Sequence, residues 1–473
     1  MHTDLIIVLD VGKTISKLTL WTKAGALLRR CTRENTRVFR GAMTVLDVHG
    51  IETWLRETLR DFAAYGQVTA IIPVAHGASL ALIRDGVLLT EPLDYEASLC
   101  GGELDSYQLE RGRFDETGSP RLPGGLNLGA QIYWLEHSYP ELFDDRLLIV
   151  PYPQYWSWLL SGIAASEVTS FGCHSDLWNP TANTLSKIAY RRGWADRLAP
   201  IRRADAILGP ISQSWAEQTG LGRDVQIYCG IHDSNAALLA ARSHEEIAGR
   251  DLTVLSTGTW FIAMRTPEIG ANFNRCDFSE ARDCLVNVDI DGKPVPSARF
   301  MGGREIELLI GLGNGRIDVV SEQPLLFAAL NTVIANEVMV LPTMIPGCGP
   351  FPNGQSRWMT PPANNHERKA AISLFAAMMV DAMLGLIDAR HMLLIEGRFA
   401  SAEIFVRALA TLRPDIRIYL SPGYDSVSRG ALRLVSKTLC PAETIIEVRP
   451  LDTSLDAYHA SWKHYARRSE EAA

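Results

Sequence analysis

The sequence predicts an α/β protein built from two similar halves. In the first half, apolar residues on both sides of the polar stretch 10–17 predict two strands joined by a tight turn. The same strand–polar turn–strand pattern returns in "DLTVLSTGTWFIAMR", which begins at Asp251. At 473 residues the chain is long enough for two domains with separate cores. The repeated pattern therefore indicates an internal duplication, with a boundary between Arg242 and Arg250.

The remaining elements of the first half follow from local patterns. A third strand is expected at "ALLRRCTREN", and Asp47 and Gly50 introduce a helix over "IETWLRETLRDFAAYG", which Gly66 ends. "VTAIIPVAHG" then predicts a strand buried on both faces. This order differs from the strand, glycine-rich turn and helix that open a dinucleotide-binding domain. The irregular region 101–218 is rich in Trp, Tyr, Pro and His, which is typical of ligand-binding walls.

The pattern of apolar residues also predicts helices and strands later in the chain. A strand over Val225–Cys229 enters a Gly-Ile-His-Asp turn and a helix of small residues. A long helix is expected over Glu367–Ala389, followed by the strand "LLIEG", the helix "AEIFVRALATL" and the strand "IRIYL". A final helix is expected to begin near Ser426.

Composition excludes several classes of protein. The net charge of −8 argues against a nucleic-acid backbone or an anionic membrane as the main partner. The opening "MHTDLIIVLD" has no signal-peptide pattern, and the apolar segment Ala370–Ala389 contains Asp381 and Asp388, as expected for a buried helix. Eight cysteines form no CxxC pair, so we expect reduced thiols, no zinc and a cytoplasmic protein.

The polar turn near the N-terminus allows two interpretations. It carries Asp10, Gly12, Lys13, Thr14 and Lys17. The residues fit a polar hairpin turn in which Gly12 supplies a positive φ. They equally fit a loop whose backbone N–H groups, carboxylate and lysines hold a phosphate and a metal ion.

Three motifs, each weak alone, occur along the chain in a specific order: Asp10-x-Gly12-x-Thr14-x-x-Lys17, His232-Asp233 and Ser256-Thr257-Gly258-Thr259. Together with "FMGGREIELL" and "IEGRFASAEIFVRALATL", they make the chain resemble the FGGY family of carbohydrate kinases over nearly its full length. "GIHD", "STGTW" and "HSDLW" are most similar to the rhamnulokinase and fuculokinase type. The resemblance implies two actin-like (ribonuclease H-like) ATPase domains, 1–245 and 246–473, with a nucleotide and sugar cleft between them.

The resemblance also implies the catalytic groups. Asp233 matches the family's general base, which accepts the proton of a sugar hydroxyl as that oxygen attacks the γ-phosphate of ATP. The alternative is that Asp233 caps the helix that follows. Asp10 and Asp233 are expected to hold Mg²⁺.

The resemblance assigns nucleotide binding to residues of four motifs: Lys13, Thr14, Lys17, Gly258, Thr259, Gly303, Glu307, Gly397 and Ala402. Lys13 departs from the family, where a small hydroxyl residue is common, and it is expected to face either the phosphates or solvent. Glu396 and Ala402 depart from the usual glycine-rich adenine turn, which indicates relaxed nucleotide selectivity.

Sugar-binding roles are expected for a set of polar residues and one glycine: His76, Gly77, Asp94, Tyr95, Asn127, Gln131, His174, Asp176 and His232. A polyol needs several paired donors and acceptors, which these residue types supply. For each of them the alternative is a satisfied core group or a turn residue, and we expect about half to touch substrate. Trp134, Trp156, Trp158 and Trp178 are expected in the core.

The implied activity is transfer of phosphate from Mg-ATP to a small ketose or polyol. L-rhamnulose, L-fuculose, L-ribulose, D-xylulose and four-carbon polyols all remain open, and a homodimer is usual for the family. A nucleotide-driven switch on the same scaffold and a non-catalytic sugar sensor are the alternatives. A dehydrogenase has the least support, because "GLGNG" (Gly311–Gly315) is a lone glycine cluster.

Overall fold

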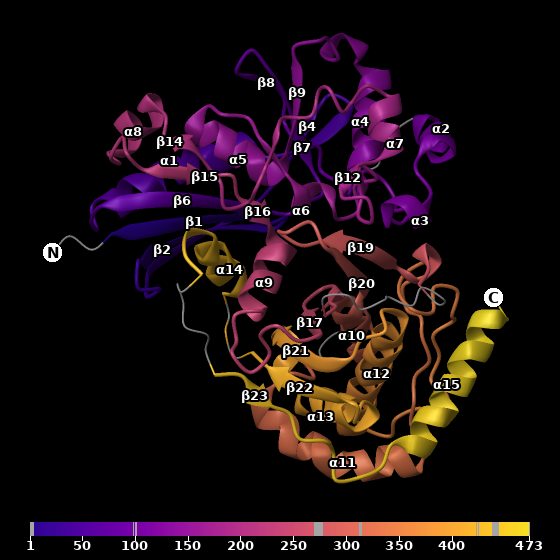
Figure 1. Ribbon diagram of the computed structural model, residues 1–473. Coiled ribbons are helices and arrows are strands. Elements are labelled where there is room, and N and C mark those ends of the chain that lie inside the picture. Colours follow the sequence, from indigo (N-terminus) through magenta and orange to yellow (C-terminus); the bar gives the residue numbers. More distant parts are fainter. Residues whose placement is uncertain are drawn as a thin grey trace. The chain divides into compact units, whose positions relative to one another are not determined.

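The chain forms two compact units. The computed structural model describes residues 4–97, 99, 102–268, 278–311, 315–421, 423, 425–437 and 444–472 (Figure 1). Unit 1 comprises Met1–Ser243, Val286–Pro294 and Asp425–Ala442, and unit 2 comprises His244–Leu285, Val295–Tyr424 and Glu443–Ala473. The sequence division at 245/246 lies two residues after the first break. A single division does not describe the two later segments that belong to unit 1.

A seven-stranded mixed sheet forms the centre of unit 1, with the order β14-β15-β6-β1-β2-β3 and with β16 also paired to β6. The strands are β1 (Leu5–Val11), β2 (Ile15–Thr22), β3 (Leu27–Glu34), β6 (Val68–Ala75), β14 (Ile207–Pro210), β15 (Gln226–Tyr228) and β16 (Ile231–His232). β1 pairs antiparallel with β2 and parallel with β6. These are the strand–turn–strand unit and the buried strand that the sequence predicts.

Strand β1 is buried on both faces because helices cover both sides of this sheet (Figure 1). Leu5, Ile7 and Leu9 pack with α1 (Val48–Ala63) and α5 (Tyr152–Ser161). Ile6 and Val8 point to the opposite face, into the cluster that includes α9 (Asp233–Ala241) and α14 (Ser426–Val435). Each fully buried aliphatic side chain contributes about 1.5–3 kcal/mol. The strand that carries Asp10 is therefore anchored from both sides.

The predicted helix after the third strand is confirmed as α1, whose N-cap Asp47 accepts a hydrogen bond from the Gly50 N–H group. The sequence reading missed one hairpin before it, formed by β4 (Arg37–Arg40) and β5 (Met43–Leu46). These strands are only four residues long each, and Gly41 between them has a φ of 58°. So brief a pattern gives little periodic signal.

The region between 76 and 225 contributes a three-stranded sheet and several short elements. The sheet has the order β8-β7-β9. Its strands and the other small elements are β7 (Leu80–Arg84), β8 (Val87–Thr90), β9 (Leu147–Pro151), β10 (Ser166–Glu167), β11 (Trp178–Asn179), β12 (Thr184–Leu185), β13 (Ile201–Arg202), α2 (Glu103–Glu110), α3 (Phe114–Thr117), α4 (Leu128–Ser138), α6 (Val168–Phe171), α7 (Lys187–Arg191), α8 (Gln213–Thr219) and the 3₁₀ turn Pro140–Leu142. Trp134, Trp156 and Trp178 are buried, and Trp158 packs partly buried against the core, as expected.

Unit 2 repeats the central arrangement of unit 1. Its sheet has the order β19-β20-β18-β17-β21-β22-β23. The elements are β17 (Leu252–Thr257), β18 (Phe261–Thr266), β19 (Cys284–Val288), β20 (Pro294–Phe300), β21 (His391–Gly397), β22 (Ile416–Leu420), β23 (Ile446–Glu447), α10 (Gly302–Ile310), α11 (Gln323–Ala335), α12 (Asn365–Leu386), α13 (Glu403–Leu412), α15 (Asp456–Glu471) and the 3₁₀ turns Glu280–Arg282, Val320–Glu322 and Arg398–Ser401. β17 pairs antiparallel with β18 and parallel with β21, as β1 pairs with β2 and β6.

Helix α12 is long and apolar enough to cross a membrane by length and composition, and 89% of its most apolar window is buried inside the structure. Its buried Asp381 is balanced from α15, where His459 Nε2 lies 3.1 Å and Lys463 Nζ 3.3 Å from a carboxylate oxygen. The predicted burial of this helix is confirmed, and the structure adds the charge partners of Asp381.

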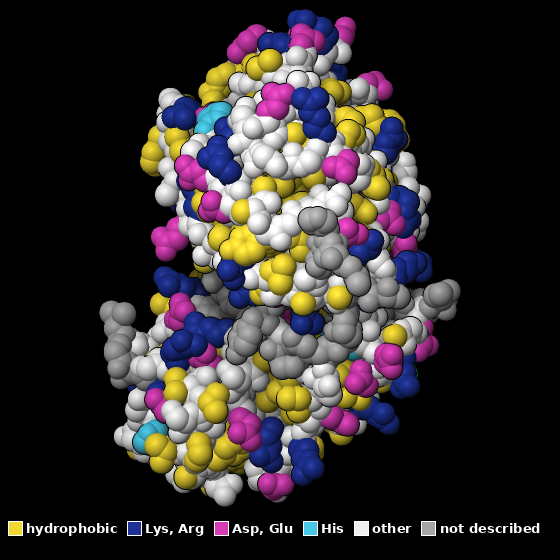
Figure 2. Space-filling view, turned by 90° about the vertical axis from the view of Figure 1, so that its left-hand side faces the viewer, with side chains coloured by type: hydrophobic (Ala, Val, Ile, Leu, Met, Phe, Trp, Pro, Cys, Tyr) yellow, Lys and Arg dark blue, Asp and Glu magenta, His cyan; other side chains and the backbone are white. Residues whose placement is uncertain are grey.

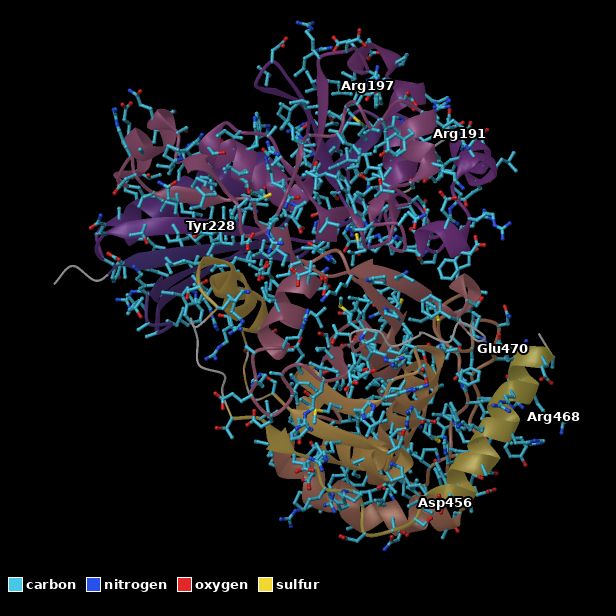
Figure 3. All side chains as sticks on the ribbon, in the orientation of Figure 1. Arg191, Arg197, Tyr228, Asp456, Arg468 and Glu470 are labelled. Atoms are coloured by element: carbon cyan, nitrogen blue, oxygen red, sulfur yellow. The ribbon has the colours of Figure 1, made fainter. Side chains whose placement is uncertain are left out.

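The prediction that the final helix begins near Ser426 is wrong, because a further helix, α15, follows at Asp456–Glu471. Figure 3 labels Asp456, Arg468 and Glu470 along it. Tyr458, Trp462 and Ala466 are buried and recur every four residues among charged neighbours. This stripe is the signal that the sequence reading passed over.

Five cysteines fall within the described residues (Cys31, Cys173, Cys229, Cys284 and Cys348), and all five are free. Cys100, Cys276 and Cys440, with the middle of "GLGNG", lie outside the described residues. On the face drawn in Figure 2, Lys and Arg side chains are interspersed with Asp, Glu and hydrophobic side chains on both units.

Replacing Gly430 in α14 should destabilise unit 1, because a Cβ there would lie 1.7 Å from the Ala236 carbonyl oxygen of α9. We expect Gly430→Ala to lower the free energy of unfolding by about 1–3 kcal/mol, measured by urea unfolding. The control is Gly385→Ala in α12, where a Cβ meets nothing within 4 Å and helix propensity improves by up to ~1 kcal/mol. Equal stability of the two variants would contradict the close packing.

Candidate active site

Three parallel strands of unit 1 bring their carboxyl ends together. On β6, Val74 is the register partner of Asp10 on one side and of Ile231 on the other. Ala75 ends β6, and His76 follows it directly. Because parallel strands end at the same edge of a sheet, the first turn (12–14), His76 and the His232–Asp233 turn emerge at one place. These are three of the positions that the sequence singled out.

The first turn is short and tightly braced. The Gly12 N–H group donates to the Ile15 carbonyl at 3.0 Å, and the Asn35 side chain donates to the Gly12 carbonyl at 2.8 Å. A Cβ at Gly12 would lie 2.9 Å from the Ile15 oxygen, whereas its φ is outside the left-handed region. The expected positive φ is therefore wrong, and crowding by backbone explains the glycine instead.

Lys17 lies between two carboxylates from distant parts of the sequence. Its Nζ is 3.0 Å from Asp10 Oδ2 and 2.9 Å from Asp425 Oδ1. Arg30 approaches the other oxygen of Asp425 at 2.6 Å, and the Ser428 hydroxyl donates to Asp425 at 2.9 Å. Asp425 and Arg30 were missed in the sequence analysis, and we call Asp10, Lys17, Arg30 and Asp425 the Lys17 network.

The electrostatics of this network favour a bound cation. Burial raises the pKa of Asp10 to about 6; Lys17 opposes this shift, and the charges of Asp233 and Asp425 add to it. Although burial disfavours its charge, the pKa of Lys17 is raised by Asp10 and Asp425. Against burial, Lys17 and Arg30 lower the pKa of Asp425. Asp10 and Asp233 thus repel each other at a place where a cation would relieve the repulsion.

A magnesium ion fits this donor set. Within the described ranges, no group of three or more His, Cys, Asp or Glu residues is placed to hold a metal ion. Mg²⁺ commonly takes one or two carboxylates and completes its shell with waters and substrate phosphates. The pair Asp10 and Asp233 meets that requirement, because each is a carboxylate and their charges interact.

Asp233 is the first residue of α9. Its Oδ1 accepts a hydrogen bond from the Ser234 N–H group at 2.6 Å and lies 3.2 Å from His232 Nε2. The helix N-cap position belongs to His232, whose side chain makes no capping hydrogen bond. With 29% of its side chain exposed, Asp233 is accessible to a ligand.

A buried glutamate, Glu167, is linked to the His232–Asp233 turn through hydrogen bonds of Thr169. The Thr169 hydroxyl donates to Glu167 Oε2 and accepts from the His232 N–H group at 3.2 Å. The Thr169 N–H group donates to the same Glu167 oxygen at 2.9 Å. Burial raises the pKa of Glu167 to about 8, against the hydrogen bonds from Thr169. The sequence analysis missed this pair, because neither residue lies in a recognisable motif.

His76 presents a buried donor without an acceptor. Its Nδ1 accepts from the Ala78 N–H group at 3.4 Å, so the proton of the neutral ring resides on Nε2, which has no hydrogen-bond partner. Burial lowers the pKa of His76 to about 4. Gly77 is required by packing, because a Cβ would lie 2.9 Å from Cys173 Sγ and 3.0 Å from His232 Cδ2.

Lys13 lies beside Asp94 and Tyr95. Its Nζ forms an ion pair with Asp94 and lies 4.7 Å from the centre of the Tyr95 ring. Arg37 Nε is 3.1 Å from the other Asp94 oxygen. The Tyr95 ring also meets His76 edge-on at a centroid distance of 5.2 Å. The Lys13 side chain is 15% exposed, so it lies largely out of solvent.

Asn127 and Asp176 are saturated by protein groups. The Asn127 amide donates to the Ser119 hydroxyl and to two carbonyls, and its oxygen accepts from the Leu122 N–H group. Asp176 accepts from the Tyr107 hydroxyl at 2.7 Å and from Arg111 at 2.9 Å. Their hydrogen bonds are those of satisfied core groups, the alternative that the sequence left open.

Gln131 and His174 form different hydrogen bonds with the protein. Gln131 donates to the Ala78 carbonyl at 2.7 Å and to the Gly125 carbonyl, while its buried Oε1 has no hydrogen-bond partner. His174 Nδ1 lies 2.7 Å from the Leu126 carbonyl. Gln131 therefore offers a buried acceptor, next to the Ala78 backbone that also contacts His76.

In unit 2, two glycines allow separate backbone segments to approach the turn between β17 and β18. A Cβ at Gly303 would lie 2.1 Å from the Gly258 oxygen and 3.1 Å from Thr259 Cα. A Cβ at Gly397, whose φ is 90°, would lie 2.3 Å from the Thr257 oxygen. The structure therefore brings Gly258, Thr259, Gly303 and Gly397 together, with α10 starting at Gly302.

Hydrogen bonds fix the neighbouring "EGRFASA" turn. Glu396 accepts from the Ser256 hydroxyl at 2.7 Å. Arg398 donates to both oxygens of Asp318 at 3.1 and 3.3 Å and to Glu307 at 3.3 Å. Ala402 is fully buried, so it packs in the core of unit 2. Arg398 and Asp318 were missed by the sequence analysis.

Comparisons with known proteins find carbohydrate kinases similar to this chain. Residues 249–443 match the family described as carbohydrate kinase FGGY, C-terminal domain. A crystal structure of a carbohydrate kinase from Novosphingobium aromaticivorans is 46% identical, with 99% of each chain covered and a TM-score of 0.94. A ligand-bound xylulose kinase from Lactobacillus acidophilus is 14% identical, with 99% of this chain and 97% of that chain covered and a TM-score of 0.78, which shows the fold.

A curated relative matches a shorter stretch. The rhamnulokinase of Halalkalibacterium halodurans is 29% identical over 132 residues, which is 28% of this chain and 27% of that protein. The match therefore spans about a quarter of the length of that relative.

Glu167→Gln should change how stability depends on pH. Glu167 binds a proton up to about pH 8 when folded and up to about its ordinary pKa of 4.5 when unfolded. The wild type therefore loses stability from this group as pH rises between those values. We expect the melting temperature of Glu167→Gln, relative to wild type, to rise across that window, with the exposed Glu217→Gln as control. A pH-independent difference would contradict the assignment.

Proposed function

Because the chain belongs to the FGGY family of carbohydrate kinases, we propose that it transfers the γ-phosphoryl group of ATP to a hydroxyl of a small ketose or polyol. The observation that carries the proposal is the accessible Asp233 carboxylate, placed at the sheet edge where Asp10 and His76 also emerge. A base, a cation-binding carboxylate and a buried donor in one place suit attack by a hydroxyl on a phosphate.

Asp233 acts as the general base in this proposal. The sugar hydroxyl loses its proton to the Asp233 carboxylate as its oxygen bonds to the γ-phosphorus, and the bond to the ADP oxygen breaks. His232, 3.2 Å from Oδ1, orients the carboxylate. The Glu167–Thr169 pair holds the His232 backbone, so the turn keeps its position through the reaction.

Lys17 and Thr14 face the transferred phosphate. Lys17 stays charged because Asp10 and Asp425 raise its pKa against burial, so it supplies a fixed positive charge to the phosphate oxygens. Asp10 and Asp233 would hold Mg²⁺, which neutralises phosphate charge when bound. Asp425 and Arg30 hold Lys17 in place during transfer.

The glycine-lined turn of unit 2 binds the nucleotide phosphates. The Gly258 N–H group already donates to the Trp260 carbonyl at 3.0 Å, so the Thr259 N–H group and those at the start of α10 are the ones that would hold phosphate oxygens. Gly303 and Gly397 let these backbones approach closely. Arg398 follows Gly397 and donates to both oxygens of Asp318, so this ion pair fixes the turn that the resemblance assigns to adenine.

Two neutral groups, one donor and one acceptor, bind the sugar in this proposal. The His76 Nε2–H group and the Gln131 Oε1 atom are a buried donor and a buried acceptor without protein partners. Hydroxyl groups satisfy both kinds. A six-carbon ketose such as L-rhamnulose or L-fuculose is our first choice, because a rhamnulokinase is among the relatives. L-ribulose, D-xylulose and four-carbon polyols are the alternatives, and a xylulose kinase shares the fold.

Asp233→Asn tests the proposal. We expect kcat to fall by about 10²–10⁴, because the amide cannot accept the hydroxyl proton, while the KM for ATP stays within about twofold. The measurement is ketose-dependent ADP release at saturating ATP. Asp205→Asn, an exposed carboxylate of unit 1 paired with Arg203, is the control and should match wild type. A kcat within threefold of wild type would reject Asp233 as the base.

A further inference from the structure

We propose that Lys13 is a sugar-binding residue and that the Lys13–Asp94 pair couples the first turn to the sugar pocket of unit 1. The inference rests on the proposed function, because it takes a sugar as the substrate. It assigns to the sugar a residue for which the sequence indicates only phosphate or solvent.

Lys13 contacts residues next to the proposed sugar-binding residue His76. Its ammonium is paired with the fully buried Asp94 carboxylate and lies above the Tyr95 ring. Glu96 is 3.9 Å away. The Asp94 backbone is held by hydrogen bonds to the Thr44 carbonyl and from the Ala97 N–H group, so the partner of Lys13 is itself fixed.

An independent observation points to ligand binding beside this pair, namely a buried donor that no protein group satisfies. The Tyr95 ring contacts His76 edge-on, and His76 Nε2 is a buried donor without an acceptor. The charges of Lys13, Asp94, Asp233 and His232 all act on His76. Lys13 therefore lies within the same cluster as the orphaned donor and the proposed base.

The neighbours of Lys13 decide which ligand it takes. Lys13 and Arg37 face Asp94 and Glu96, so the two positive and two negative charges balance, as they do in the Lys17 network. What distinguishes Lys13 is its position over the Tyr95 ring, which contacts the ring of His76, whose Nε2 has no partner. An ammonium carries three N–H donors, and donors beyond the one directed at Asp94 can bind a neutral hydroxyl or keto oxygen of the sugar.

The position of Lys13 in the chain lets it couple sugar binding to the positioning of the phosphate. The same turn, between β1 and β2, contains Thr14 and is flanked by Asp10 and Lys17. A sugar oxygen that engages Lys13 therefore strengthens contacts of the turn that faces the transferred phosphate. Sugar binding and phosphate positioning are linked through one short, braced loop.

The test is Lys13→Thr, with Lys13→Arg as the conservative variant and Lys23→Thr as the control. Lys23 is an exposed lysine paired with Asp4 in the same unit. The probe is whichever of L-rhamnulose, L-fuculose, L-ribulose or D-xylulose gives the highest turnover with wild type. KM values for that ketose and for ATP are measured, together with binding of the ketose alone by calorimetry.

We expect Lys13→Thr to raise the KM and the Kd for the ketose at least tenfold, with the KM for ATP within twofold of wild type. Lys13→Arg should recover most of the loss, and Lys23→Thr should show none. A raised KM for ATP with unchanged ketose binding would overturn the inference, and so would no change in either. Absence of turnover by wild type with these four ketoses and with four-carbon polyols would instead overturn the proposed function, and this inference with it.

Discussion

The Lys17 network is the interaction on which the rest of unit 1 depends. The Asp10 side chain is 13% exposed at the end of a strand that is packed on both faces, and an unpaired carboxylate there would cost several kcal/mol. Lys17 compensates Asp10 and is shared with Asp425, so one ammonium joins β1, β2 and the N-cap of α14. Arg30 balances the second carboxylate. The sheet edge can thus carry a high charge density and remain folded.

This charge arrangement also explains how binding and chemistry are divided within unit 1. In the proposed reaction, Asp10 and Asp233 hold a cation, whereas Lys17 supplies its charge to phosphate. His76 is neutral because burial lowers its pKa, so it offers the sugar a donor that adds no charge. We therefore propose that phosphate and sugar meet different electrostatics at neighbouring turns of one sheet edge.

Local patterns allowed much of this fold to be predicted. β1, β2, α1 and β6 were expected from apolar periodicity and from Asp47, and the pairing in both units follows the repeated strand–turn–strand pattern. Asp425 was not predictable, because its contact with Lys17 spans 408 residues and no local pattern records it. Glu167 was missed for the same reason, since it acts through Thr169 on a turn far along the chain. Asn127 and Gln131 look alike in sequence, but one has all its hydrogen bonds made within the protein and the other keeps a buried acceptor.

The most direct test of the account follows the γ-phosphate itself. Wild-type protein is incubated with Mg²⁺, ATP carrying a radioactive γ-phosphate and each ketose or polyol in turn, and the labelled products are separated. The account predicts that label leaves ATP in the presence of one substrate and is recovered as a sugar phosphate, with little inorganic phosphate. Label recovered as inorganic phosphate regardless of the sugar, or retained in ATP with every sugar, would contradict it.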